Sequence, residues 1–322
     1  MNDAPVHNGG VLVTGAAGFI GSRLLRELAS HGAGPVTALD LREVPASQRL
    51  PAILYETADI RSPALHEIFA RVRPRTVVHL ASVVAVGGDE KRDYEIDVLG
   101  TRNVLEACIA AGVRHIVVTS SGAAYGYHAD NPVPLRETDA LRGNEDFPYA
   151  RNKREVEEML ARYRHEHPQL LQTVFRPCTV LGPTTDNQIT ALFERPVVTG
   201  LSGTATPFSL IADDDVVAAL AQAVRGGKAG VYNLAGDGTL SLREIARLNG
   251  RPFLPIRPAV MKSALWLLHA LRLTRLTPQN VKFIQFRPVL DNTRLKSEFN
   301  YTPRHDAREV FERYRDGRGV QR

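Results

Sequence analysis

A glycine-rich turn after a short apolar run near the N-terminus constrains the fold of this chain more than any other feature. Residues 11–14 read Val-Leu-Val-Thr, the turn spans residues 15–21, and leucines then recur at helical spacing. In such a strand–turn–helix unit Gly15 lets the chain reverse, Gly18 leaves the backbone open to a pyrophosphate, and Gly21 lets the helix pack closely on the strand. The amides and dipole at the helix start favour a bound anion. The pattern predicts a nucleotide-binding turn, and a purely structural glycine turn is the alternative.

A carboxylate at the end of the next apolar run supports the nucleotide interpretation. Residues 36–40 end in Asp40, about 20 residues after Gly21, where dinucleotide-binding units place the group that hydrogen-bonds the adenosine ribose. A carboxylate there would repel a 2′-phosphate, so we expect NAD rather than NADP. Arg42 leaves an alternative open, because it could reach a phosphate, stay solvated or pair with Glu43.

Strands and helices alternate along the first half of the chain. Strands are expected at 52–55, 76–81, 115–119 and 173–176, and helices at 63–72, 94–111 and 149–165. This alternation predicts a Rossmann-type α/β fold, a doubly wound parallel sheet with helices on both faces. Farther along we expect a helix at 216–224, a strand at 231–234, a capping-box helix from Ser241 to Gly250 and a helix at 307–314.

The alternation loosens after Pro177, where Pro, Gly and Thr dominate through Pro207. We therefore expect a smaller lobe interleaved with the sheet. Residues 1–176 and 209–235 form the expected NAD-binding lobe, residues 177–208 and 236–312 a substrate-binding lobe, and residues 313–322 a tail.

Composition and charge exclude several other classes of protein. Hydrophobic content of 43% and charged content of 23% are those of an ordinary globular chain. The net charge of +5 is spread along the sequence, so we expect no nucleic-acid partner. Cys108 and Cys178 stand in unrelated contexts, and residues 165–167 lack further ligands at zinc-like spacing, so neither a disulfide framework nor a metal site is expected. The polar N-terminus lacks a signal-peptide pattern and the apolar run 264–271 is too short to cross a bilayer, so we expect a cytoplasmic protein without a membrane span.

Three polar side chains are candidates for catalysis. Strand 115–119 would deliver Ser121 to the carboxyl edge of the sheet, where ligands bind in such folds and where its hydroxyl could meet a substrate oxygen. Tyr149 and Lys153 share one helix face, and the ammonium would favour the phenolate, which suits the phenol to proton transfer during hydride movement. The alternative is that Tyr-x-x-x-Lys is a chance spacing and that Ser-Ser-Gly is only a turn.

The ordered motifs resemble those of extended short-chain dehydrogenases/reductases, the NAD-dependent epimerase/dehydratase family, over essentially the whole chain. They are Thr14-Gly-Ala-Ala-Gly-Phe-Ile-Gly21, Asp59-Ile60, His79-Leu-Ala-Ser82, Gly100-Thr-Arg-Asn-Val-Leu-Glu-Ala107, Thr119-Ser-Ser-Gly-Ala-Ala-Tyr-Gly126, Tyr149-x-x-x-Lys153, Arg176-Pro177, Asp215-Val-Val, Asp291-Asn-Thr-Arg and Tyr301-Thr-Pro303. The resemblance implies that the glycine turn binds NAD through Gly15, Gly18, Phe19, Ile20 and Gly21. It implies that Asp40 binds the adenosine ribose and that Asp59 and Ile60 bind the adenine. It further implies that Ala81 lines the cofactor channel and that Tyr149 and Lys153 bind at the nicotinamide ribose. It also implies that Ser121, Tyr149 and Lys153 are catalytic.

Several positions depart from the family pattern. Asp97 stands where relatives usually carry Asn. Gly122 and Ala123 replace the Asp-Glu pair of the sugar dehydratases, so dehydration is not expected. Nucleotide-sugar epimerases usually carry Asn at the place of Thr179 and a pyrophosphate-binding Arg at the place of Phe208. The resemblance therefore implies a substrate less anionic than a nucleotide sugar, bound in part by Ser121, Thr179 and Phe208.

Three functions follow as hypotheses. The first is an NAD-dependent oxidoreductase that moves hydride between NAD and a secondary alcohol or ketone carbon. The second is a nucleotide-sugar epimerase similar to UDP-glucose 4-epimerase. The third is a non-catalytic NAD-binding regulator, which would have no physical need for a hydroxyl, a phenol and an ammonium in one pocket.

The substrate pocket is expected to be apolar and hydroxylated rather than cationic. Its expected lining is Thr179, Thr184, Thr185, Phe208, Trp266, Leu267 and Phe283. Lys282 and Arg287 could restore a cation from the C-terminal lobe, and the stretch around Trp266 could instead be lobe core.

A homodimer is the expected assembly, because relatives commonly pair through the two helices at 94–111 and 149–165. Apolar residues on these helices could supply the interface or could simply cover the sheet, namely Ile96, Val104, Leu105, Val156 and Met159.

Overall fold

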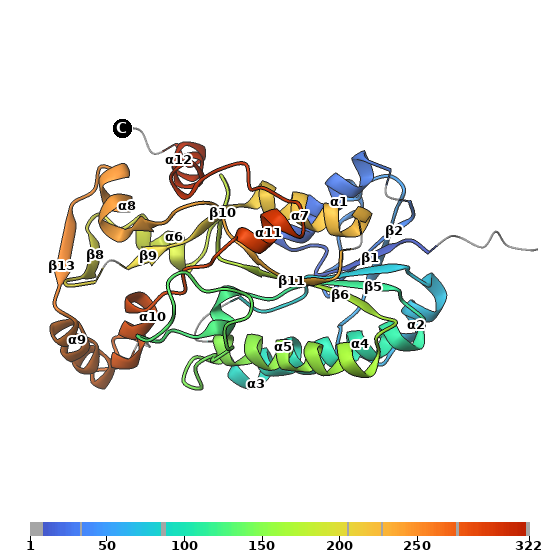
Figure 1. Ribbon diagram of the computed structural model, residues 1–322, viewed down its shortest axis with the longest axis horizontal. Coiled ribbons are helices and arrows are strands. Elements are labelled where there is room, and N and C mark those ends of the chain that lie inside the picture. The colour runs from blue at the N-terminus through green and yellow to red at the C-terminus, as the bar shows by residue number, and fades with distance from the viewer. Residues whose placement is uncertain are drawn as a thin grey trace, which may run out of the picture.

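In the computed structural model, which describes residues 9–32, 34–84, 88–204, 206–226, 228–274 and 277–319, a seven-stranded sheet forms the larger lobe (Figure 1). Its strands are β1 (Val11–Thr14), β2 (Val36–Asp40), β3 (Ile53–Thr57), β4 (Thr76–His79), β5 (His115–Thr119), β6 (Leu171–Pro177) and β11 (Gly230–Leu234). Their order is β11-β6-β5-β4-β1-β2-β3, and all neighbouring pairs are parallel. The strand order reverses between β1 and β4, so ligands are expected in the crevice at their carboxyl ends. The predicted Rossmann-type fold is confirmed.

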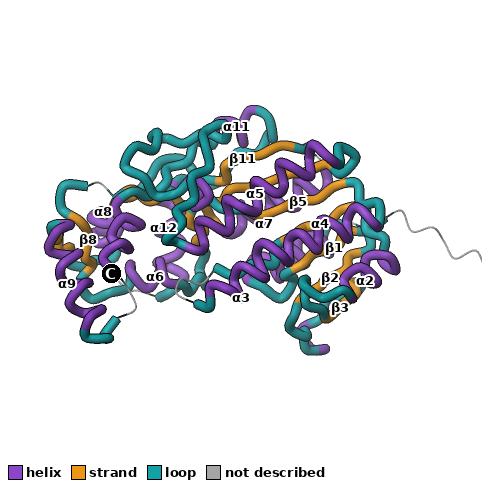
Figure 2. The backbone as a smooth tube through the Cα atoms, turned by 90° about the horizontal axis from the view of Figure 1, so that it is seen from below, coloured by secondary structure: helices purple, strands orange, loops and turns teal. Residues whose placement is uncertain are grey.

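Helices cover both faces of the sheet, as its largely buried strands require. On one face, α1 (Phe19–Ser30) and α7 (Asp213–Gly226) pack on the strands through a cluster that includes Leu24, Leu28 and Leu220. On the other face lie α2 (Ala64–Val72), α4 (Thr101–Ala110) and α5 (Pro148–Glu166), with α4 beside α5 (Figure 2). Four of the residues proposed as a dimer surface belong to this second core and are at most 4% exposed, namely Val104, Leu105, Val156 and Met159. These side chains therefore cover the sheet, and Ile96 packs partly buried against them.

The smaller lobe is built from short paired strands and short helices. Three pairs of strands form it: β7 (Thr179–Leu181) with β10 (Leu210–Ala212), β9 (Pro207–Phe208) with β12 (Leu240–Ser241), and β8 (Val198–Leu201) with β13 (Phe253–Ile256). Its helices are α6 (Gln188–Phe193), α8 (Leu242–Leu248), α9 (Pro258–Ala270), α10 (Val281–Gln285) and α12 (Ala307–Gly317). The capping box predicted at Ser241 is present, and Gly250 follows α8 with a φ of +62°. Within the described parts of the chain, no helix is both long enough and apolar enough to cross a bilayer.

The boundary between the lobes differs in places from the expected one. Strand β10, expected in the NAD-binding lobe, pairs instead with β7 of the smaller lobe. Residues just after helix α11 (Thr293–Ser297), expected in the smaller lobe, pack in the core beneath α1 and α7 through Phe299 and Tyr301. Residues 313–317 are not a tail, because α12 runs to Gly317 and Tyr314 is buried. Each of these segments belongs to the lobe whose apolar cluster its side chains pack into. The order of segments in the sequence does not show which cluster that is.

The helix expected at 94–111 is divided into α3 (Glu90–Tyr94), a π-helical turn η2 (Glu95–Gly100) and α4. Asp97, buried in the π turn, accepts a hydrogen bond from the Val83 amide at 2.9 Å, and Thr101 Oγ1 donates to the Asp97 carbonyl at 2.5 Å. The Asp97 side chain thus ties this helix to the loop that follows β4. The remaining short turns are η1 (Ala46–Gln48), η3 (Gly122–Tyr125) and η4 (Pro278–Asn280).

Candidate active site

The glycine turn between β1 and α1 has the close approaches that its sequence predicts. Gly15 has a φ of +68°, and a Cβ built on it would lie 2.6 Å from the Ala81 amide nitrogen. A Cβ on Gly21 would lie 2.2 Å from the Gly15 carbonyl oxygen, so α1 rests directly on the turn. Gly18 precedes α1 and has no side chain to cap it. The first amides of α1 are therefore available to an anion such as a pyrophosphate.

The Asp40 side chain, at the end of β2, is bonded to the glycine turn. Its carboxylate accepts hydrogen bonds from the Ala17 and Arg42 amides, each at 2.9 Å. The Arg42 guanidinium lies 3.5 Å from the same carboxylate and donates to the Ala17 carbonyl at 2.9 Å, whereas Glu43 pairs with Arg49. Arg42 therefore pairs with Asp40 rather than Glu43.

Asp59 and Ile60 lie beside each other after β3. Ile60 is buried against Gly100, where a Cβ would be 2.6 Å from the Ile60 Cδ1. The Arg61 guanidinium contacts Asp59 at 2.6 Å and Glu95 at 3.1 Å, and its hydrogen bond to Asp59 lowers the pKa of that carboxyl. An open hollow of about 450 Å³ is lined by Asp59, Arg61, Ser62, Glu95 and Leu99. Asp59 lines this hollow, whereas Ile60 is buried beside it.

Lys153 is held at the carboxyl end of β4. Its buried ammonium donates to Ser82 Oγ at 2.7 Å and lies 5.6 Å from the centre of the Tyr149 ring. Below it, His79 contacts Thr14 at 2.7 Å and Thr101 at 3.0 Å. Burial, with a smaller effect of the Lys153 charge, lowers the pKa of His79 to about 3. His79 is therefore neutral near pH 7.

Ser121 lies two residues after the end of β5 and caps the η3 turn. Its Oγ accepts a hydrogen bond from the Ala123 amide at 3.1 Å. Ala123 packs with Ala150 of α5 in a small cluster against which Tyr149 lies partly buried. The structure therefore brings the Ser121 turn against the start of the helix that carries Tyr149 and Lys153.

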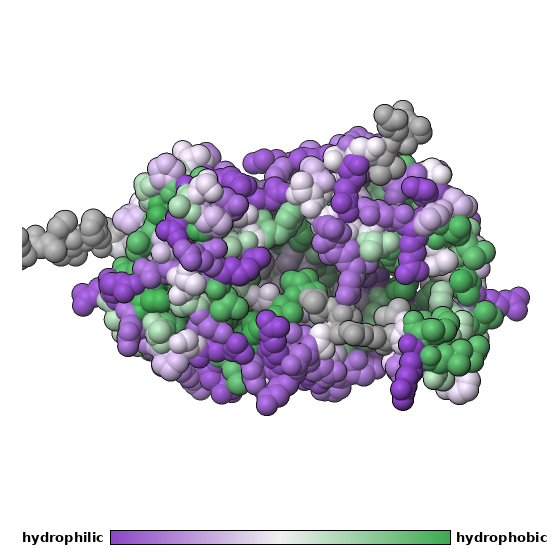
Figure 3. All heavy atoms as spheres, turned by 180° about the vertical axis from the view of Figure 1, so that it is seen from behind, coloured by the Kyte–Doolittle hydropathy of each residue, from purple (hydrophilic) through white to green (hydrophobic). Residues whose placement is uncertain are grey.

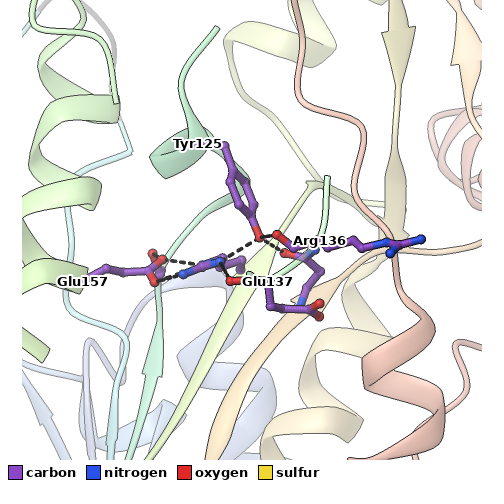
Figure 4. A network of polar contacts seen from close by, with 7 residues as sticks. Tyr125, Arg136, Glu137 and Glu157 are labelled. Atoms are coloured by element: carbon purple, nitrogen blue, oxygen red, sulfur yellow. Dashed lines mark hydrogen bonds and ion pairs between the residues drawn. The ribbon is translucent and has the colours of Figure 1, made fainter. Parts of the chain in front are cut away.

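A buried polar network holds Tyr125, the last residue of the η3 turn that Ser121 caps (Figure 4). Arg176 of β6 pairs with Glu157 of α5 at 2.6 Å, and Ser120 donates to the same carboxylate at 2.5 Å. Arg176 also donates to the Tyr125 hydroxyl at 2.7 Å, and Tyr125 in turn donates to Asn233 of β11 at 2.8 Å. Burial raises the pKa of Tyr125 to about 12. The network fixes β5, β6, β11 and α5 to one another and leaves the Ser121 hydroxyl outside it.

The substrate side of the site differs from the expectation of an uncharged pocket. Phe208 is fully buried in the core of the smaller lobe, and the Arg287 guanidinium lies 4.0 Å from the centre of its ring. Arg287 also donates to Thr179 Oγ1 at 3.0 Å. Burial lowers the pKa of Arg287, against smaller opposing effects of Tyr127 and Cys178. Arg287, from the C-terminal part of the chain, thus places a cation beside Phe208 and Thr179, where the sequence had predicted an uncharged pocket.

Most of the other residues expected in the pocket lie away from Arg287, Phe208 and Thr179 or have partners of their own. Lys282 pairs with Asp146 at 2.6 Å. Thr184 is exposed and accepts a hydrogen bond from Arg23, whereas Thr185 is buried and accepts one from the Gly182 amide. Trp266 and Leu267 are 65% and 52% exposed on α9, so they belong neither to a pocket nor to the lobe core. Phe283, by contrast, does lie at the site.

Phe283 of α10 is part of an aromatic cluster that sequence reasoning largely missed. It stacks on Phe147 at 4.2 Å between ring centres and meets Tyr127 edge-on at 5.2 Å. Tyr149 packs against the same cluster. The only signal in the sequence was that Tyr127 follows the Ser-Ser-Gly motif and that Phe147 precedes Tyr149.

Gly122 and Ala123 stand where sugar dehydratases would place two carboxylates. A Cβ on Gly122 would lie 3.0 Å from a methyl group of Leu290, and Ala123 is buried in the cluster against α5. The packing here leaves little room for an acid–base pair.

Comparisons with known proteins identify relatives over most of the chain. An uncharacterized protein of Mycobacterium tuberculosis is 28% identical over 320 residues, covering 96% of this chain and 84% of that protein. A UDP-glucose 4-epimerase of Mycolicibacterium smegmatis is 32% identical over 238 residues, covering 68% of this chain and 74% of the relative. Among solved structures, MoeE5 in complex with UDP-glucose and NAD has a TM-score of 0.74 and 26% identity, covering 97% of this chain and 100% of MoeE5.

The glycine turn, Asp40 and the paired Tyr149 and Lys153 occupy the edge of the sheet where a dinucleotide and its substrate would meet. The family model described as "NAD dependent epimerase/dehydratase family" matches residues 11–235, which include all of these positions. This chain is therefore an enzyme that belongs to the NAD-dependent epimerase/dehydratase family.

Proposed function

We propose that this enzyme moves hydride between NAD and the carbinol carbon of a nucleotide sugar, and that the net reaction is epimerisation. The observation that supports this substrate class is Arg287, which lies between Phe208 and Thr179 and has no carboxylate partner among the described residues. A partly buried guanidinium without an anionic partner is unfavourable, so an anion is expected to bind there. A diphosphate matches the fork of donors that a guanidinium presents.

The proposed chemistry uses three side chains. The chemistry that bound NAD would supply is reversible acceptance of the hydride. As the carbon–hydrogen bond breaks, the Tyr149 side-chain oxygen takes the hydroxyl proton and gives it back when the ketone is reduced. The Lys153 ammonium lies 5.6 Å from the centre of the Tyr149 ring, and Ser121 donates a hydrogen bond to the substrate oxygen. The first amides of α1 and Asp40 would hold the pyrophosphate and the adenosine ribose of NAD.

Epimerisation and net oxidation share these steps and differ in the fate of the ketone. The sequence favoured net oxidation of a less anionic compound because Phe208 replaces the expected cation. Arg287 places a cation against the Phe208 ring, so the absence of a cation at position 208 no longer argues against a nucleotide sugar. The relative from Mycolicibacterium smegmatis named as a UDP-glucose 4-epimerase also supports epimerisation.

Calorimetry with UDP-glucose and UDP-galactose on the NAD-loaded protein tests the proposal. We expect binding in the micromolar range and interconversion of the two sugars without accumulation of NADH. Binding with steady production of NADH would instead identify a dehydrogenase of nucleotide sugars. Absence of binding, together with NADH production from uncharged secondary alcohols, would return the assignment to the less anionic substrate.

We also propose a cytoplasmic homodimer. The free cysteines Cys108 and Cys178 agree with a reducing compartment. An interface through α4 and α5 would have to use their outward faces, because Val104 and Met159 are buried. Light scattering at micromolar concentration is the test, and a monomer would contradict the assembly.

A further inference from the structure

Helix α9 exposes large apolar side chains near its start, at Val260, and along its C-terminal half from Trp266 onward. None of residues 258–270, all of which the structure describes, is buried. Val260, Ala264, Leu267 and Leu271 recur at helical spacing and form one exposed stripe that continues beyond the end of the helix. The large exposed apolar residues of this surface are Val260, Trp266, Leu267, Leu268, Leu271 and Leu273, of which Leu273 is 71% exposed. Such a contiguous patch marks an interaction surface rather than ordinary exposure of single residues.

This α9 surface lies apart from the candidate active site. Helix α9 occupies the far end of the smaller lobe, away from the sheet and the glycine turn (Figure 1). In the view from behind, hydrophobic side chains gather at the same end of the molecule (Figure 3). The catalytic residues proposed above do not need this surface, so its exposure calls for a separate explanation.

The segment around α9 is also strongly basic. Residues 245–290 contain no Asp or Glu. The same stretch contains eight Lys or Arg residues, namely Arg247, Arg251, Arg257, Lys262, Arg272, Arg275, Lys282 and Arg287. Arg257, Lys262 and Arg272 are exposed at the start, middle and end of α9, and exposed His269 lies near Arg272. An apolar stripe bordered by cations, with no compensating acid in this stretch, is complementary to a surface that is both apolar and anionic.

We propose that α9 and the turn at 271–274 bind the surface of a membrane that contains anionic lipids. The apolar stripe would enter the boundary between headgroups and acyl chains, Trp266 would sit at that boundary, and Lys262 and Arg272 would contact lipid phosphates. A second copy of the chain is a poorer occupant, because pairing two such faces would bring like charges together. The 13 residues of α9 are too short to cross a bilayer but long enough to lie along its surface.

Trp266 is the only tryptophan of the chain, so its fluorescence reports directly on this surface. The NAD-loaded full-length protein is titrated with vesicles of phosphatidylcholine alone and of phosphatidylcholine with phosphatidylglycerol. We expect the emission to shift to shorter wavelength, and the protein to sediment, with the anionic vesicles only. Leu267→Gln with Leu271→Gln should abolish binding, and Lys262→Gln with Arg272→Gln should weaken it roughly tenfold or more.

Matched controls carry the same changes elsewhere. Leu54→Gln replaces a comparably exposed leucine on β3, and Arg26→Gln with Arg162→Gln removes two exposed charges from α1 and α5. Both controls should bind the anionic vesicles as the wild type does. Equal loss of binding in the controls, or no binding of the wild type, would overturn the proposal. A blue shift that grows with protein concentration without vesicles, together with a dimer lost in the Leu267→Gln/Leu271→Gln variant, would overturn it in favour of self-association.

Discussion

At the scale of single residues, Arg287 combines partial burial with the absence of an acidic partner among the described residues. The guanidinium is placed by the Phe208 ring and the Thr179 hydroxyl, which orient it without neutralising its charge. Such an arrangement costs folding free energy unless an anion is bound, so it is expected where binding, rather than folding, requires the charge.

Arg287→Met should therefore separate stability from binding. We expect the unliganded variant to keep or raise its thermal midpoint, because an unpaired cation is replaced by an apolar side chain. Affinity for UDP should fall by roughly 10- to 100-fold, the usual range for a charged hydrogen bond of about 1.5–3 kcal/mol. Lys282→Met is the control, since Lys282 already pairs with Asp146 and should matter little for UDP. Unchanged UDP affinity in Arg287→Met would remove the main support for an anionic substrate.

Tyr149→Phe tests the proposed proton transfer. The ring keeps its place against the aromatic cluster and only the hydroxyl is lost, so turnover should fall by about 10²- to 10⁴-fold while the NAD dissociation constant changes little. Lys153→Met should harm both quantities, because the same ammonium bonds to Ser82 and lies near the Tyr149 ring. Near-normal turnover of Tyr149→Phe would show that the proton takes another path.

At the scale of elements, the unit β1–turn–α1 depends on how closely the helix approaches the turn. Gly21→Ala would place a Cβ 2.2 Å from the Gly15 carbonyl oxygen, a contact with backbone that no side-chain rotation relieves. We expect α1 to shift, NAD binding to be lost, and stability to fall by roughly 1–3 kcal/mol as in overpacked cores. Gly226→Ala, at the exposed end of α7 with nothing within 4 Å, is the matched control and should be neutral or slightly stabilising. Calorimetric NAD titration and urea unfolding of both variants would check this, and equal behaviour of the two would contradict it.

The sequence predicted these elements well where local patterns decide the structure. The strand at His115–Thr119 matches β5 residue for residue, and the capping box at Ser241 opens α8 as expected. Within the helix expected at 94–111, residues 95–100 form a π-helical turn in which the Asp97 carboxylate bonds to Val83, a contact between distant segments that periodicity cannot show. The contact between Arg287 and the Phe208 ring also joins distant segments of the chain. The sequence therefore predicted Phe208 in the pocket and offered Arg287 only as an alternative.

At the scale of the whole molecule, buried histidines couple stability to pH. Burial lowers the pKa of His115 to about 4, and burial with the nearby Lys153 lowers that of His79 to about 3, from the ordinary value of 6.5. Below pH 6.5 the unfolded chain binds protons that the folded protein does not. Stability from these groups is therefore complete above pH 6.5 and is lost as the pH falls toward 4 and then 3.

His79→Gln should make unfolding less dependent on pH. Glutamine can still donate and accept hydrogen bonds between Thr14 and Thr101 but takes up no proton. Between pH 6.5 and 5 the free energy of unfolding of the wild type should fall more steeply than that of the variant, by up to about 1.4 kcal/mol per pH unit. Urea unfolding at several pH values measures both slopes, and parallel slopes would show that His79 is not held neutral by the fold.

The path of the chain between the lobes has a consequence for how such an enzyme can change its substrate. After β6 the chain enters the smaller lobe, returns for α7 and β11, leaves again through β12 and α8, returns for α11 and ends in α12, while Leu135 bridges to Leu290 across the two lobes. Because no single cut divides the sequence into two units that each own a core, recombination at one junction cannot exchange the smaller lobe as a block. Under the proposed function, new specificity would arise by substitutions within an intact chain, and Thr179, Phe208 and Arg287, which meet from three separate segments, would have to change together.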